Sequence, residues 1–81
     1  MEKVVYNTKY FIIYEKRIEG RKTPILKIVG AYGEDLGQIK WYGAWRKFCF
    51  YPGVDTIWDN KCLEELLKFI NEYNSEWRST K

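Results

Sequence analysis

The chain has 81 residues, of which 46% are apolar and 19% aromatic, enough for one small core and a single domain over residues 1–81. It has no histidine and only two cysteines, which argues against structural zinc and most acid–base catalysis, so we expect no metal, no cofactor and no enzyme activity. Its formal net charge of +3 does not define a partner, and without a membrane-spanning apolar run or signal-peptide core we expect a cytoplasmic protein with no membrane contact.

Four strands are predicted, in chain order. The first covers about residues 4–15, which are rich in β-branched and aromatic side chains, and the second covers about 24–31. The third and fourth, about 36–42 and 45–51, are joined at Gly43-Ala44, a pair typical of a two-residue hairpin turn. For the first strand the sequence does not decide which face is buried. One face would carry Tyr6, Tyr10, Ile12 and Tyr14, and the other would carry Lys9, Phe11 and Ile13.

A helix is predicted over about residues 60–77, after an N-cap at Asp59-Asn60. Its apolar residues recur at steps of three and four: Cys62, Leu63, Leu66, Leu67, Ile70, Tyr73 and Trp77. We therefore expect an α+β fold, a four-stranded antiparallel sheet (ββββα) with this amphipathic helix packed on one face. The other face would be left to solvent or to a partner.

Aromatic residues concentrate between Trp41 and Tyr51, where they occupy six of eleven positions. A two-residue turn pairs residues whose numbers sum to 87, which places Ile39 opposite Phe48 and Trp41 opposite Arg46 on the core face. On the outer face it places Tyr42 opposite Trp45 and Lys40 opposite Lys47. Opposed lysines repel each other, so this outer face is a candidate site for a ligand that supplies negative charge.

The candidate ligand-binding residues combine cations with aromatic rings. Cations hold phosphate and rings stack on bases, so the set indicates nucleic acid or a nucleotide. Residues 1–54 carry ten Lys/Arg against five Asp/Glu, which also favours an anionic partner. The alternative is that tyrosine, tryptophan and lysine occur here only because they suit exposed strands. The candidates are Lys40, Tyr42, Trp45, Arg46, Lys47 and Tyr51.

The segment from Leu36 to Pro52, followed by Cys62-Leu63, resembles small phage and prophage proteins that share the pattern G-x-I-K-W-Y-x-x-W-R-x-Y-C-F-x-P. The likeness covers about residues 36–72, with Phe48 in place of the family's tyrosine. It implies a phage accessory role, either in binding nucleic acid or in disarming a host defence by sequestering a nucleotide signal or binding a host protein.

Three hypotheses follow for the outer face. The first is a non-enzymatic binder of nucleic acid or a nucleotide, and the alternative is an inhibitor of a host protein that uses the same aromatics as hot spots. The third is a homo-oligomer formed through the sheet face or a sheet edge.

Overall fold

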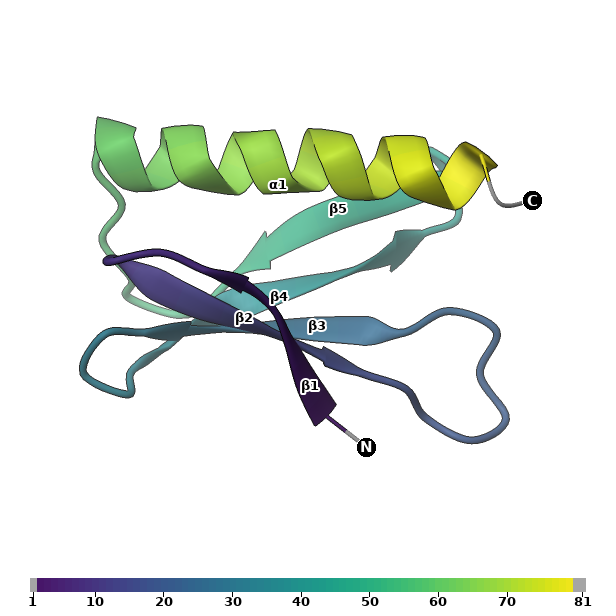
Figure 1. Ribbon diagram of the computed structural model, residues 1–81, viewed down its shortest axis with the longest axis horizontal. Coiled ribbons are helices and arrows are strands. Elements are labelled where there is room, and N and C mark those ends of the chain that lie inside the picture. The colour runs from purple at the N-terminus through teal and green to yellow at the C-terminus, as the bar shows by residue number, and fades with distance from the viewer. Residues whose placement is uncertain (1, 80–81) are drawn as a thin grey trace.

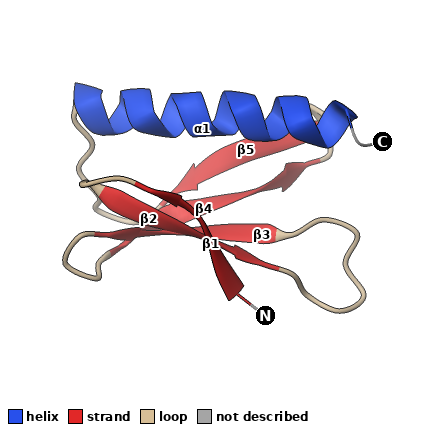
Figure 2. Ribbon diagram, in the orientation of Figure 1, coloured by secondary structure: helices blue, strands red, loops and turns tan. Residues whose placement is uncertain are grey.

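The computed structural model describes residues 2–79 and folds them into five strands and one helix (Figure 1). The strands are β1 (Glu2–Asn7), β2 (Phe11–Lys16), β3 (Ile25–Gly30), β4 (Asp35–Tyr42) and β5 (Lys47–Pro52), and they form one antiparallel sheet in chain order. The helix α1 (Asn60–Ser79) lies across one face, and Figure 2 shows no second layer on the opposite face within residues 2–79. The predicted α+β class and C-terminal helix are confirmed, but the sheet has five strands rather than four.

The strand predicted over residues 4–15 is in fact a hairpin of β1 and β2. The hydroxyl oxygen of Thr8 accepts hydrogen bonds from the backbone N–H groups of Tyr10 (3.0 Å) and Phe11 (3.1 Å), and the Thr8 N–H donates to the Phe11 carbonyl (2.9 Å). A threonine side chain can stabilise a turn in this way without glycine or proline. The sequence therefore has no glycine or proline to mark this turn, only Asn7 and Thr8.

The core lies between the sheet and α1. It also answers the question of the buried face for β2, because Phe11 and Ile13 are fully buried whereas Ile12 and Tyr14 lie on the opposite face. The predicted grouping of Tyr6 and Tyr10 with Ile12 and Tyr14 is wrong, because the turn at Thr8 breaks the alternation and both tyrosines pack against the core. Burial of these side chains supplies the main stabilisation of so small a domain. The buried apolar residues are Phe11, Ile13, Leu26, Ile28, Leu36, Ile39, Phe48, Leu66 and Phe69.

The helix begins where it was predicted but is rotated from the predicted stripe. Asp59 Oδ1 accepts a hydrogen bond from the Cys62 N–H (2.8 Å), which confirms the cap. Leu63 and Leu67, predicted to be buried, are 47% and 60% exposed, whereas Phe69, which was missed, is 6% exposed. The rotation turns the aromatic residues of the helix toward the sheet.

Asn74 fixes the C-terminal half of α1 to β5. Its side chain is 8% exposed, with Oδ1 accepting from the Phe48 N–H (2.9 Å) and Nδ2 donating to the Phe48 carbonyl (3.1 Å). One amide thus satisfies both backbone groups of a residue on the outer strand, as a neighbouring strand would. This part of the β5 edge is therefore already covered.

Candidate nucleic-acid interface

The β4–β5 hairpin turns through four residues, 43–46, not two. The Tyr42 carbonyl accepts from the N–H groups of Trp45 (3.2 Å) and Arg46 (2.9 Å), and Arg46 takes a left-handed conformation with φ 56°. The register moves by two residues, so Lys40 pairs with Cys49 and Tyr42 with Lys47. The predicted opposition of Lys40 and Lys47 is therefore wrong.

The predicted faces survive this correction, because side chains alternate with a period of two. Lys40, Tyr42 and Lys47 share one face, and Trp41 pairs with Phe48 on the other. Trp45 and Arg46, predicted opposite Tyr42 and Trp41, lie in the loop instead. Trp45 reaches back to Tyr42, with the two rings edge-to-face at a centroid distance of 5.0 Å.

We call the side of the sheet opposite α1 the open face. On β2 to β5 it comprises the alternate positions 12, 14 and 16; 25, 27 and 29; 38, 40 and 42; and 47, 49 and 51. None of these side chains is buried, and they include four lysines, three tyrosines and no carboxylate. Glu2 of β1, paired with Lys16, and Asp35 at the start of β4 lie at its margins. Its residues are Ile12, Tyr14, Lys16, Ile25, Lys27, Val29, Gln38, Lys40, Tyr42, Lys47, Cys49 and Tyr51.

One end of the open face holds most of the predicted ligand-binding residues. The Lys40 Nζ lies over the Tyr51 ring, 4.5 Å from its centroid. Beside it is a hollow of about 170 Å³, large enough for one planar ring. The hollow is lined by Tyr42, Trp45, Cys49, Phe50 and Tyr51.

Three open-face residues of the inner strands β2, β3 and β4 are not among the predicted ligand-binding residues. Tyr14 is directly opposite Lys27, Lys27 is opposite Gln38, and Gln38 is opposite Tyr51. They form a continuous row across four strands that ends at the hollow. Alternation within each segment gives the faces, but the row depends on the order and register of the whole sheet.

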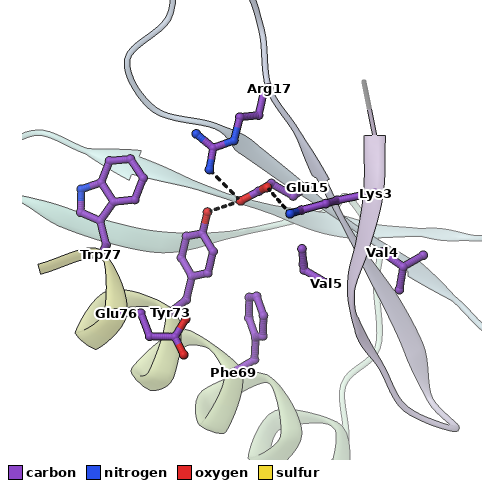
Figure 3. Close-up of a pocket in the computed structure, with 9 residues that line it drawn as sticks. All are labelled: Lys3, Val4, Val5, Glu15, Arg17, Phe69, Tyr73, Glu76 and Trp77. Atoms are coloured by element: carbon purple, nitrogen blue, oxygen red, sulfur yellow. Dashed lines mark hydrogen bonds and ion pairs between the residues drawn. The ribbon is translucent and has the colours of Figure 1, made fainter. Parts of the chain in front are cut away.

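A second group of polar side chains lies on the helix side, in a groove of about 490 Å³ between β1, β2 and α1 (Figure 3). Glu15 is 5% exposed there, and it accepts a hydrogen bond from the Tyr73 hydroxyl at 2.7 Å. Arg17 and Lys3 approach the same carboxylate at 3.5 and 3.9 Å. These partners offset the cost of burying a charge, so the group ties α1 to β2.

The hydroxyl groups that tie the helix to the sheet have raised pKa values. Burial, with the hydrogen bond to Glu15 second, raises the pKa of Tyr73. The hydrogen bond from the Tyr6 hydroxyl to Glu65 (2.7 Å) is the main cause that raises the pKa of Tyr6 to about 12. Both hydroxyl groups therefore stay protonated, and able to donate a hydrogen bond, at pH values above the ordinary pKa of tyrosine.

The cysteines and carboxylates do not gather into a metal site. No group of three or more potential metal-binding side chains occurs among residues 2–79. Cys49 and Cys62 are both free and half-buried, as expected for small apolar side chains. Within the same range no helix is long and apolar enough to cross a membrane.

Comparison with known proteins gives one informative match. Over 73 residues the chain is 30% identical to an "Uncharacterized 9.3 kDa protein" of Acholeplasma phage L2, in an alignment that covers 89% of this chain and 94% of that protein. The chain belongs to the family of this phage protein. The expected likeness to small phage proteins is confirmed at this level, and it extends well beyond the predicted range of residues 36–72. The detailed residue pattern of that segment stays a prediction. No family model and no solved structure matches the chain.

Proposed function

We propose that this phage-family protein binds nucleic acid, without catalysis, through the open face. The observation that supports this most strongly is the separation of charge. The open face carries Lys16, Lys27, Lys40 and Lys47 on four different strands, with no carboxylate between them. Such an arrangement attracts a polyanion, and the cost of bringing the lysines together falls when phosphates lie among them. The carboxylates of α1, by contrast, lie on the other side of the molecule: Glu64, Glu65, Glu72 and Glu76.

Aromatic rings on the same face favour nucleic acid over other polyanions. A sheet with one face on a helix and rings on the other is a frequent platform for stacked bases. At the hairpin end the Lys40 ammonium lies 4.5 Å from the centroid of the Tyr51 ring. A cation that can bind phosphate therefore lies over an aromatic ring, and the two kinds of group occur together at this end of the open face. The neighbouring hollow, lined in part by Tyr42 and Trp45, has room for one base.

A polymer suits this face better than a free nucleotide. The lysines lie on β2, β3, β4 and β5, and adjacent strands are about 4.8 Å apart, so the outermost cations are separated by more than one phosphate group can bridge. A mononucleotide would engage only the hairpin end, at Lys40, Lys47 and the hollow. We therefore expect mononucleotides to compete weakly with an oligonucleotide.

The test is a charge reversal with a matched control. We expect Lys40→Glu plus Lys47→Glu to abolish binding of a fluorescently labelled oligonucleotide measured by anisotropy. Lys61→Glu plus Lys68→Glu changes the net charge equally, but both residues are exposed on α1. This control should retain most of the affinity. Equal losses in the two variants, or no binding by the wild type, would contradict the proposal.

A second candidate function, binding of a host protein, is supported by a different surface. Leu63 and Leu67 lie one turn apart on α1 and are 47% and 60% exposed, while Val54 and Ile57 of the preceding loop are 90% and 91% exposed. Exposed apolar side chains of this kind are typical of protein contacts. If this surface binds a host protein, Leu63→Ser plus Leu67→Ser will lose a partner captured from nuclease-treated lysate, whereas Lys40→Glu plus Lys47→Glu will retain it.

Homo-oligomerisation through the open face is disfavoured by the same charge pattern. Two copies joined face to face would bring their lysines together without carboxylates to compensate. We therefore expect a monomer in light scattering when nucleic acid is absent, and a dimer that persists at high salt would favour pairing through the face or an edge.

A further inference from the structure

Within the proposed function, on which this step rests, we infer that the nucleic acid is single-stranded and that it crosses the strands of the sheet along one row of side chains. This row consists of Tyr14, Lys27, Gln38 and Tyr51, and we call it the base row. Each member is the direct cross-strand partner of the next. The strands are about 4.8 Å apart, so the two tyrosines are about 14 Å apart, a span of a few nucleotides.

The chemistry of the base row suits unpaired bases. Tyr14 and Tyr51 place rings at its two ends, where each can stack on a base. Gln38 lies between them, and its amide both donates and accepts hydrogen bonds, as the edge of an unpaired base requires. Lys27 supplies a cation within the row. At the Tyr51 end the row runs into the shallow hollow beside Trp45, where a terminal base can lie.

The two flanks of the base row differ, which orients the strand. On one flank Lys16 is opposite Ile25 and Lys40 is opposite Cys49, so this flank carries one cation on β2 and another on β4. On the other flank Ile12 is opposite Val29, and both are apolar, while Asp35, opposite Val29 on β4, carries a negative charge. Phosphate groups are stabilised by the lysines of the first flank, and the second flank offers them no cation. The sugar–phosphate backbone therefore follows the Lys16–Lys40 side, with the bases directed toward Ile12 and Val29.

A duplex cannot use these features. Its base faces are covered by neighbouring base pairs, so the rings of Tyr14 and Tyr51 have nothing to stack on. The apolar side chains Ile12 and Val29 would face its phosphates or remain in water. Only the lysines would contribute to the affinity for a duplex. Binding through phosphate contacts alone is weak and independent of sequence.

This proposal can be tested by comparing the binding of a single-stranded oligonucleotide with that of a duplex of the same length, at one salt concentration, by anisotropy. We expect the single strand to bind at least about tenfold more tightly, as one stacked base alone would give. Tyr14→Leu should lose about tenfold in single-strand affinity and little for the duplex. Tyr32→Leu is the matched control, because Tyr32 is 96% exposed in the β3–β4 turn, outside the open face.

A second pair of variants keeps the test independent of any effect of Tyr14 on folding. Lys27→Glu reverses an exposed charge in the base row, and Lys22→Glu reverses an exposed charge in the β2–β3 loop. Only the first should weaken single-strand binding strongly. If the duplex binds as tightly as the single strand, or if Tyr14→Leu and Lys27→Glu bind like the wild type while Lys40→Glu plus Lys47→Glu does not, the base row is refuted and the proposed function stands. If the wild type binds neither probe, the proposed function itself fails.

Discussion

Asn74→Ala should destabilise the fold strongly, although a small polar side chain on a helix is usually a minor contributor. The amide is 8% exposed and makes hydrogen bonds of 2.9 and 3.1 Å to both backbone groups of Phe48. Its removal leaves one N–H and one C=O without this partner between α1 and β5. Each buried group that loses its partner costs about 1–3 kcal/mol. Because both lie at the edge of the sheet, where water can enter, we expect a total loss of about 2–4 kcal/mol.

This loss is a large share of the stability of an 81-residue domain, which is about 4–12 kcal/mol. It can be measured as the free energy of unfolding in urea, followed by tryptophan fluorescence and circular dichroism. The control is Asn71→Ala, the same substitution on the exposed side of the same helix, which corrects for helix propensity. A difference between the two variants below about 0.5 kcal/mol would refute the role of Asn74 in docking the helix.

Two further predictions concern stability. Gly37→Ala should cost at least about 1–3 kcal/mol in urea unfolding, because Gly37 has φ 138° and an added Cβ would lie 2.5 Å from a backbone oxygen of β5. Gly43→Ala, where nothing lies within 4 Å, should be nearly neutral in the same assay, and equal losses would contradict this reasoning. Alkaline pH should also destabilise the protein. The pKa values of Tyr6 and Tyr73 are raised from 10.0 in the fold, that of Tyr6 to about 12. Their contribution to stability is therefore complete below about pH 10, and the part due to Tyr6 is lost as the pH rises through about 12. Unfolding free energies measured against pH should fall in this window, less steeply in Tyr6→Phe, and a flat profile would contradict it.

The local features of the fold could be predicted from the sequence because local interactions determine them. The helix starts at the predicted place since Asp59 caps it directly. The two faces of β4 and β5 were assigned correctly because alternation survives a shift of two residues. By contrast, the turn at Thr8 depends on one hydroxyl, and the longer hairpin loop depends on a left-handed Arg46, which residue types do not reveal.

Features that depend on contacts between distant segments could not be predicted. The helix periodicity fits a stripe with Leu63 as well as one with Phe69, and only packing against the sheet selects the second. The role of Asn74 requires the position of β5, and the base row from Tyr14 to Tyr51 requires the register of four strands. The predicted site therefore contained only the part of the open face within one hairpin.

The salt dependence of single-strand binding tests the central claim most directly. Each phosphate neutralised on a single strand contributes about −0.7 to the slope of log affinity against log salt, so contacts from all four open-face lysines give a slope of about −2.8. We expect this slope for the wild type and for Lys61→Glu plus Lys68→Glu, and a slope about 1.4 units shallower for Lys40→Ala plus Lys47→Ala. No binding, a slope near zero, or the same slope in Lys40→Ala plus Lys47→Ala as in the wild type would contradict the claim.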